Sequence, residues 1–244
     1  MKLLRSLSLP LLALPALAAP AESLVGIPLR PGKGGDAFGL PIQIVLLLTA
    51  LTVLPAVLVS LTPFLRISLV LHFLRQALGT QTAPSNQVLV GLSLFLSLLV
   101  ISPVAREAYS RGWEPLEQGR LSRQEAWDAG SRPIKDFLLR FAREKDIALI
   151  VEITRSPRPR SPQELGLGVL APAYVLSELK AGFQIGAVLF LPFLVIDIAV
   201  ASITLSIGMV QLPPVMVSAP FKILLFVLVD GWNLVVGSLM RSFQ

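Results

Sequence analysis

Four apolar stretches, each close to the length needed to cross a membrane, constrain this chain more than any other feature. They cover residues 41–61, 88–104, 185–207 and 217–240. A helix needs about 20 apolar residues to span the hydrocarbon core of a bilayer. The 244-residue chain is 54% apolar and 15% charged, whereas soluble domains carry about 25% charged residues. We therefore predict an all-α membrane protein.

The first 18 residues are typical of a secretory signal peptide. A positively charged start precedes a short apolar run at 7–17, and a small-x-small pattern ends at Ala18. Cleavage there would leave residues 19–39, rich in glycine and proline, as a flexible tail. The alternative is an uncleaved anchor, for which the run is short and contains two prolines.

The composition changes sharply between the second and third apolar stretches. Residues 106–164 hold twelve Lys and Arg and ten Asp and Glu, which is 22 of the 36 charged residues in the chain. We expect a charged lobe with its linker at 106–170, inserted between a first helical hairpin at 40–105 and a second hairpin at 171–244.

The lobe carries signals for helices. Ser122 and Glu125 have the spacing of a capping box, and Pro133 suits the first position of a helix. The proline-rich segment 154–163 is typical of an extended linker. One apolar helical face is predicted from residues that recur at helical spacing: Ile134, Phe137, Leu138 and Phe141.

A cleaved signal peptide fixes the predicted topology. The mature N-terminus would lie outside the cytoplasm, and a loop at 63–86, with Arg66, Arg75 and no acid, would face the cytoplasm. The lobe would then lie on the outer side, where its length exempts it from the positive-inside rule. The uncharged turn at 208–216 would return to the cytoplasmic side.

Several kinds of chemistry are excluded by what the sequence lacks. Zero cysteines rule out disulfides, thiol catalysis and cysteine-bound zinc, and His72 is the single histidine. Residues 26–34 do not match a phosphate loop, because five residues rather than four precede the Gly-Lys pair. The net charge of +6 is not arranged as a basic stripe with aromatics, so we expect no nucleic acid partner and no cofactor.

Three charges fall inside the predicted spans: Asp197, Lys222 and Asp230. Such charges are costly in a membrane unless they are paired or hydrated. Asp197 and Lys222 can approach each other within one hairpin or between neighbouring copies, either as a proton or ion relay or as an ion pair that fixes assembly. An intramembrane aspartyl protease would also use two aspartates, but its Gly-x-Gly-Asp motif is absent.

Two small-residue features bear on how the helices meet. Gly182 and Gly186 form a G-x-x-x-G pattern, which favours close approach of membrane helices. Between the last two apolar stretches, Gly208 and the Pro213-Pro214 pair prevent a continuous helix. The intervening loop is either an ordinary hairpin turn or a flexible apolar constriction.

Long runs of the chain resemble the FliP family of flagellar biosynthetic proteins. The resemblance covers residues 40–244 and is strongest outside the lobe. The runs that carry it are PFLRI at 63–67, FLRQALGTQ at 73–81, PSNQVL at 84–89, PAYVLSELK at 172–180, FQIG at 183–186, LPFLVID at 191–197, LPPVM at 212–216 and PFKILLFVLVDGWNL at 220–234.

This resemblance implies a non-enzymatic subunit of the flagellar type III export gate in the bacterial inner membrane and flagellar basal body. Kinked helical hairpins of several copies, five in the family, would join FliQ- and FliR-like subunits in a helical oligomeric cone. Other export-apparatus and basal-body proteins would surround it. The cone would conduct unfolded flagellar substrates out of the cytoplasm, with the lobe on the periplasmic side.

The resemblance also implies site residues. The family's methionine-rich pore loop matches Gly208, Met209, Val210, Gln211 and Leu212, of which only Met209 is a methionine. Charged family positions match Asp197, Lys222 and Glu178, for which we expect pairing between subunits. The alternative function is a stand-alone proton-coupled transporter that uses Asp197 and Asp230 as carriers.

Overall fold

A computed structural model of the chain describes residues 23–24, 27–28, 40–80, 82–155, 161–208 and 213–244. The chain forms two compact units, Met1–Leu54 and Pro55–Gln244. The predicted signal peptide lies outside the described residues. In chain order the elements are β1 (Ser23–Leu24), β2 (Ile27–Pro28), α1 (Leu40–Ser60), α2 (Phe64–Ala77), α3 (Asn86–Ala108), the π-helical turn η1 (Tyr109–Trp113), α4 (Glu114–Glu117), α5 (Arg123–Phe141), α6 (Glu144–Ile153), the 3-10 turn η2 (Pro162–Glu164), α7 (Leu167–Ser206), α8 (Pro214–Leu228) and α9 (Gly231–Arg241).

The predicted all-α membrane fold is confirmed. Two of the described helices are long and apolar enough to cross a membrane: α3 with its continuation to Glu117, and α7. Two more spans result if each of the bent pairs α1–α2 and α8–α9 counts as one. In the first unit, β1 and β2 pair as a two-residue antiparallel hairpin, and the described side chains of α1 up to residue 54 are exposed.

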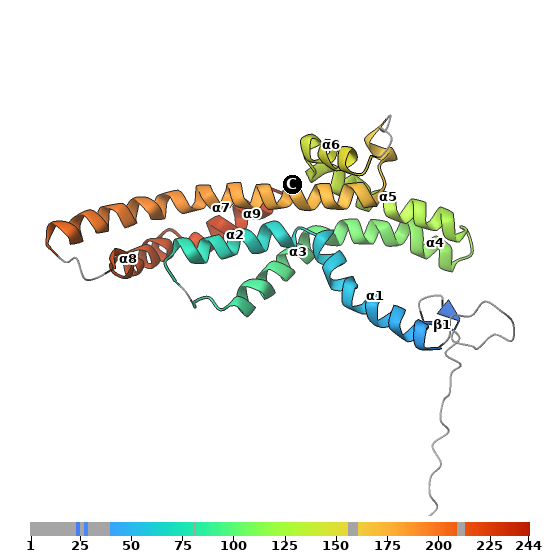
Figure 1. The fold of residues 1–244 in the computed structure, drawn as a ribbon, viewed down its shortest axis with the longest axis horizontal. Coiled ribbons are helices and arrows are strands. Elements are labelled where there is room, and N and C mark those ends of the chain that lie inside the picture. Colours follow the sequence, from blue (N-terminus) through green and yellow to red (C-terminus); the bar gives the residue numbers. More distant parts are fainter. Residues whose placement is uncertain (1–22, 25–26, 29–39, 81, 156–160, 209–212) are drawn as a thin grey trace, which may run out of the picture. The chain divides into compact units, whose positions relative to one another are not determined.

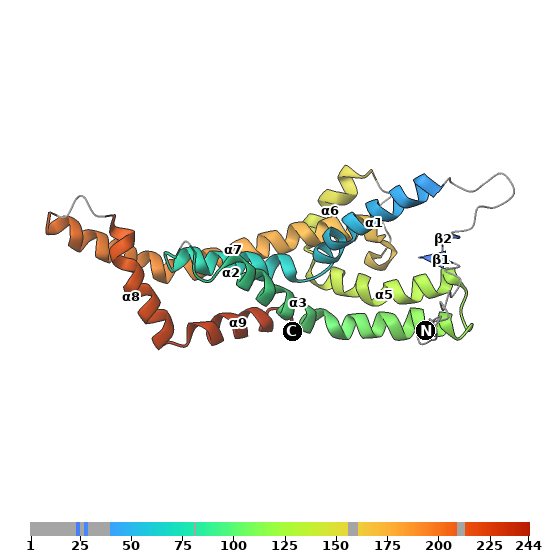
Figure 2. The same cartoon turned by 90° about the horizontal axis from the view of Figure 1, so that it is seen from below.

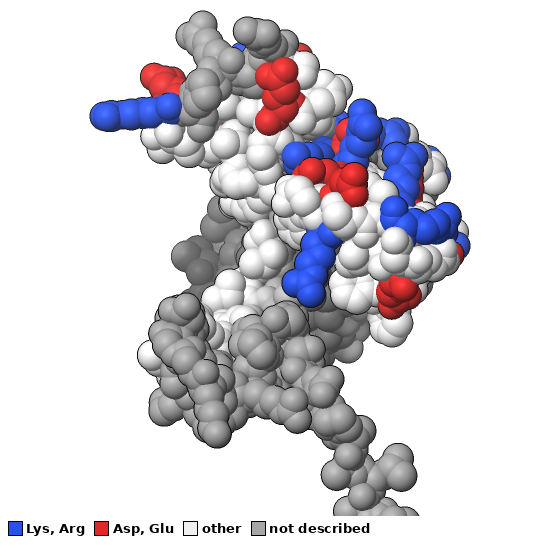
Figure 3. All heavy atoms as spheres, turned by 90° about the vertical axis from the view of Figure 1, so that its right-hand side faces the viewer, with Lys and Arg blue, Asp and Glu red and all other residues white. Residues whose placement is uncertain are grey.

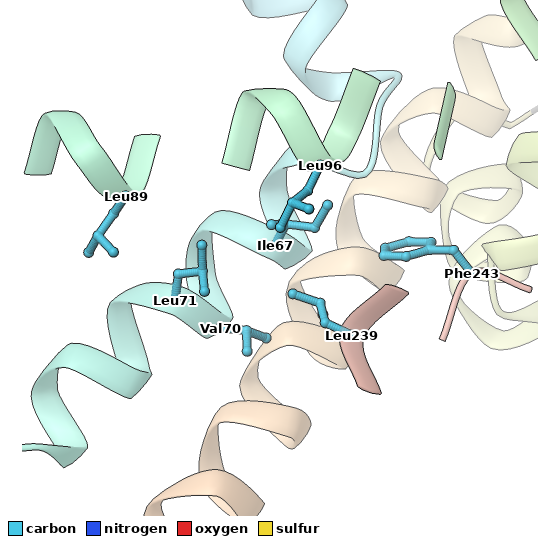
Figure 4. Packing of buried hydrophobic residues seen from close by; sticks show 7 residues of the cluster. All are labelled: Ile67, Val70, Leu71, Leu89, Leu96, Leu239 and Phe243. Carbon is cyan, nitrogen blue, oxygen red and sulfur yellow. The ribbon is translucent and has the colours of Figure 1, made fainter. Parts of the chain in front are cut away.

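The segment at 63–86, predicted as a loop, instead begins with a core helix, so the predicted loop conformation was wrong. The side of the membrane that it faces stays a prediction. Helix α2 buries Ile67, Val70, Leu71 and Leu74 completely. These residues follow the i, i+3, i+4, i+7 spacing that gives a helix one apolar face. In Figure 4 this face meets Leu89 and Leu96 of α3 and Leu239 of α9.

Helices α2 and α7 lie side by side along much of their length (Figure 1). The G-x-x-x-G pair sits at this contact, as a close-approach motif should. A Cβ atom added to Gly182 would lie 2.8 Å from Leu69, and one added to Gly186 would lie 2.3 Å from the Phe73 ring. Phe73 also packs edge-on against Phe183, with ring centroids 5.4 Å apart. The glycines therefore let two large α2 side chains press against the α7 backbone.

Helix α7 is longer than the apolar stretch at 185–207 suggested. It contains 40 residues, from Leu167 to Ser206, and its length of about 60 Å is roughly twice the hydrocarbon thickness. Pro172 and Pro192 lie inside it without ending it. The polar residues Ser177, Glu178 and Lys180 hid this continuity from a hydropathy reading, but their partners come from other helices.

The apolar stretch at 217–240, predicted as one span, is broken. Helix α8 ends at Leu228 and α9 begins at Gly231, and the two helices bend by 67° at this elbow (Figure 2). Asp230 has a φ of +50°, in the left-handed region. A Cβ atom on Gly231 would lie 2.2 Å from the Phe226 ring. The Asp-Gly pair therefore ends the helix, although its neighbours are all apolar.

The lobe sequence forms α4, α5 and α6. The predicted capping box is confirmed, because Ser122 accepts from the Glu125 amide at 3.3 Å and Glu125 accepts from the Ser122 amide at 2.9 Å. That backbone hydrogen bond from Ser122 lowers the pKa of Glu125. Pro133 was expected at a helix start, but it lies inside α5. The buried face on both sides of it, including Ala126 and Leu138, holds the helix continuous.

Acidic and basic side chains are interspersed on the lobe. Figure 3 views the side of the second unit where α4 and α5 meet. It shows no large area of a single charge sign on that face. Beneath it, α5 meets the η1 turn through glycines: a Cβ on Gly112 would lie 2.6 Å from the carbonyl oxygen of Ala126. The π-helical turn lies within the continuous helical stretch Asn86–Glu117.

Candidate functional site

The strongest candidate site is an ion pair that joins α7 to α8. Lys222 Nζ lies 2.5 Å from Asp197 Oδ2 and donates to the carbonyl oxygen of Ala77 at 3.0 Å. Ser218, one turn before Lys222, donates to Asp197 Oδ1 at 2.5 Å. The Lys222 side chain is 2% exposed and that of Asp197 is 22% exposed. Both carboxylate oxygens and the ammonium are thus hydrogen-bonded within one chain.

This pair fixes the hairpin that carries the predicted pore loop. Asp197 lies nine residues before the end of α7, and Lys222 lies eight residues after the start of α8. Gly208 follows α7 with a φ of +82°, a left-handed conformation that glycine adopts without strain. Met209, Val210, Gln211 and Leu212 lie outside the described residues, so their proposed role stays a prediction.

A second buried ion pair joins α2 to α7. Arg66 Nη2 bonds Glu178 Oε1, and the two side chains are 7% and 0% exposed. Arg66 Nη1 also donates to the carbonyl oxygen and hydroxyl of Ser242, at 3.3 and 3.1 Å. The guanidinium lies 4.2 Å from the centre of the Phe243 ring, a favourable cation–π geometry. One arginine therefore holds α2, α7 and the segment after α9 together.

Three polar atoms in this region have no hydrogen-bond partner among the described residues: Arg66 Nε, Tyr174 Oη and Glu178 Oε2. Tyr174 lies one helical turn before Glu178 on α7 and is fully buried. Buried polar atoms usually have a partner, because burying one without a partner costs free energy. None of these three atoms therefore adds to the stability of this region through a hydrogen bond among the described residues.

A third ion pair fastens α6 to α7. Asp146 accepts from Ser177 Oγ at 2.7 Å and pairs with Lys180. Burial raises the pKa of the Asp146 carboxyl, but the hydrogen bonds from Lys180 and Ser177 and the positive charges of Lys180 and Arg143 outweigh burial and hold the pKa below its ordinary range. Asp146 is therefore ionised at neutral pH.

The structure brings together two of the predicted charged residues, Asp197 and Lys222, within one chain. It places Glu178 elsewhere, with Arg66. Pairing of these three residues between subunits is not tested by a single chain and stays a prediction. Sequence reasoning missed Arg66, Ser218 and Asp146 as partners. Arg66 directly precedes the apolar stripe of α2, a signal that would have placed it in the core.

The arrangement is that of a structural charge network. Each of the three acids Glu178, Asp197 and Asp146 faces a cation. In the described part of the chain, no three His, Asp or Glu side chains gather as a metal site would require. His72 bonds the Ser68 carbonyl oxygen and the Asn86 side chain, which ties α2 to the start of α3. These contacts can hold the helices of the chain in register.

The fold and these contacts define a class: a helical membrane protein whose buried charges bind its helices to one another. A family model described as the FliP family matches residues 47–239. The chain is 47% identical to a flagellar biosynthetic protein FliP of Pectobacterium carotovorum over 229 residues, 94% of this chain and 88% of the relative. It is 45% identical to the FliP of Caulobacter vibrioides, over 93% of this chain and 85% of the relative. It is 46% identical to the FliP of Bacillus subtilis, over 83% of this chain and 91% of the relative.

The chain belongs to the FliP family. It is a flagellar biosynthetic protein with apolar helices that are able to span a membrane, as the resemblance of its sequence motifs predicted.

Proposed function

We propose that the chain is a core channel subunit of the flagellar type III export gate and conducts unfolded flagellar subunits across the inner membrane. One observation carries the proposal. The Lys222–Asp197 pair joins the two helices of the α7–α8 hairpin on its inner side. On its outer side, apolar side chains are left exposed by the described part of the chain. The exposed residues include Val188, Val195 and Ile198 of α7, and Leu224 and Leu228 of α8.

The extent of this surface supports an assembly. Val195 is 67% exposed and Leu228 is 73% exposed, on helices whose other faces are packed. A soluble monomer does not leave helices this apolar uncovered. Lipid can cover part of such a surface, but α7 is about twice as long as a bilayer is thick. Neighbouring subunits are the natural cover for the remainder, so we propose a cone of several copies with FliQ- and FliR-like subunits.

The loop at 208–212 is the proposed constriction of the channel. It joins the two helices that the Lys222–Asp197 pair holds, so every copy would present its loop at the same level. The pore side chains would be Met209, Val210, Gln211 and Leu212. On the same topology the lobe at 106–170 lies on the periplasmic side, where it would meet other lobes or basal-body proteins.

The proton-carrier alternative receives less support. A carrier carboxylate must release and regain its proton during each cycle. Asp197 instead has both carboxylate oxygens engaged within the chain, one by Lys222 and one by Ser218, as a structural ion pair would. Asp230 follows Asp197 by 33 residues in the sequence. Its side chain bonds Asn233, and no described contact links it to Asp197. We therefore favour the channel subunit.

The test is to replace Met209–Leu212 with four glycines in a strain that expresses the other export-gate proteins. The complex should assemble in normal yield, and membranes that contain it should leak ions. The control changes Gln118, Arg120 and Leu121, in the turn before α5, to glycine, so that residues 118–121 are all glycine. A leak-free membrane with normally assembled complex would show that the seal lies elsewhere.

A further inference from the structure

Outside the lobe, three charged side chains of the helical region are left without an opposite charge. Arg66 pairs with Glu178, Lys222 with Asp197, and Lys180 with Asp146 of the lobe. The remaining charged residues of 40–105 and 165–244 are Arg75, Asp230 and Arg241. No ion pair to any of these three is present among the described residues. Asp230 is the one acid of this set.

Asp230 adopts a strained backbone conformation, and its side chain does not cap the helix that it precedes. It occupies the left-handed position before α9, where glycine or asparagine would be less strained or equally suited. An aspartate before a helix normally accepts from the first free amides, but the Asp230 side chain makes no such cap. Its recorded partner is the Asn233 side-chain amide at 3.2 Å.

The surroundings of Asp230 are apolar. Leu228 is 73% exposed, Val229 is 50% exposed and Trp232 is 38% exposed. When lipid or protein covers these exposed apolar side chains, the carboxylate among them loses its water, which costs free energy. The cost is offset only if the covering molecule supplies a cation that pairs with the carboxylate. The elbow therefore presents one negative charge inside a surface that is otherwise suited to a dry interface.

Arg75 is the matching cation. It lies half-buried in the last turn of α2, and its one recorded hydrogen bond is a long one, 3.4 Å, to the Pro84 carbonyl oxygen. The other unpaired cation, Arg241, is exposed and bonds Ser238 within its own helix turn at 3.4 Å. Burial makes an absent counter-charge more costly for Arg75 than for Arg241.

We propose that Arg75 of one copy pairs with Asp230 of a neighbouring copy. The inference rests on the proposed assembly of several copies. Two different patches of the same chain, the end of α2 and the α8–α9 elbow, would meet head to tail, which is the kind of contact that closes into a ring. The two other acids outside the lobe, Glu178 and Asp197, are already paired within the chain, so Asp230 is the acid of this region that remains free to specify a neighbour.

Cross-linking tests this contact directly, because the native chain has no cysteine. Two differently tagged full-length copies, one Arg75→Cys and one Asp230→Cys, are expressed together with the other export-gate proteins. A short bis-maleimide should join the two tags in the purified complex. The control pairs Arg241→Cys with Asp230→Cys and should give at least about tenfold less product. Equal or weaker linking at position 75 would overturn the proposal.

Charge exchange tests whether the contact is electrostatic. Asp230→Asn keeps a side chain that tolerates the left-handed position, so the elbow should fold, yet complex yield should fall at least about tenfold because Arg75 is left unpaired. Arg75→Glu should do the same. The double variant Arg75→Glu with Asp230→Arg should recover most of the yield, with Asp230→Gln as the control for a longer side chain at that position.

These outcomes are separable from the channel proposal. A complex that assembles and exports normally, but gives no 75–230 cross-link and no recovery on charge exchange, refutes the pairing and leaves the channel role intact. Loss of assembly on Asp230→Asn without any effect of Arg75→Glu would also refute the pairing. The cation that faces Asp230 would then come from another protein of the complex and not from a second copy of this chain.

Discussion

Lys222 and Asp197, 25 residues apart, form an ion pair 2.5 Å long between consecutive helices, and the same ammonium group bonds the Ala77 carbonyl oxygen at the end of α2. One buried side chain therefore ties together α2, α7 and α8. A charge in this position selects one register of the hairpin, because any slip of α8 would separate it from both partners.

Lys222→Ala should lower the free energy of unfolding by about 3 kcal/mol, because it leaves the Asp197 carboxylate without its cation in a partly buried site. The variant should also reduce the yield of assembled complex. Thermal unfolding of the purified protein and native gels measure the two effects. Lys222→Met with Asp197→Leu should recover much of the lost stability, and an unchanged yield in Lys222→Ala would contradict this role for the pair.

Tyr174→Phe should leave stability unchanged or raise it by up to about 1 kcal/mol, because the buried hydroxyl has no partner among the described residues. Tyr174→Leu should lower stability by about 2 kcal/mol, since it removes a ring packed 6.0 Å, centre to centre, from Phe137. Chemical unfolding in detergent compares the three proteins. A clear loss in Tyr174→Phe would mean that a bound water or a partner chain uses the hydroxyl.

Gly186→Ala should separate α2 from α7. The new methyl group would lie 2.3 Å from the Phe73 ring, and overpacking of this kind costs about 1–3 kcal/mol. Gly168→Ala, in the first turn of the same helix, meets nothing within 4 Å and should be neutral or slightly stabilising. Thermal unfolding compares the Tm of the Gly186→Ala variant with that of the Gly168→Ala variant. Equal Tm values would show that α2 can move away from the new methyl group without loss of stability.

Asp146 gives the docking of α6 a defined pH dependence. Its pKa is held below the ordinary value of 3.8, so the ionised pair contributes stability above that pH and loses it as the pH falls through the lowered pKa. Asp146→Asn should have a lower Tm than the native protein at pH 7, and the difference should shrink below about pH 4. A difference that is the same at pH 3 and pH 7 would rule out the charge as its source.

The hydropathy pattern and the short motifs were enough to predict helices of membrane length, the Ser122–Glu125 capping box and the FliP family. These features depend on residues that are near one another in the sequence. The same is true of Gly182 and Gly186, whose spacing indicated a close helix contact, although it did not identify α2 as the partner.

Hydropathy averaging failed where charges are neutralised from a distance. Arg66 made α2 resemble a cytoplasmic loop, and Glu178 and Lys180 hid the first half of α7, because a sliding window counts a charge as polar whatever faces it. It also passed over Asp230 and Gly231, since two residues hardly lower the mean of a long apolar stretch.

The sequence by itself determined what kind of helices this chain forms, because helix formation and membrane compatibility follow from local composition. Only the tertiary structure decided which charges are paired within the described part of the chain and which have no ion-pair partner there. That choice depends on contacts between residues such as Arg66 and Glu178, 112 positions apart, whose energy becomes favourable only when the surrounding helices have removed the water.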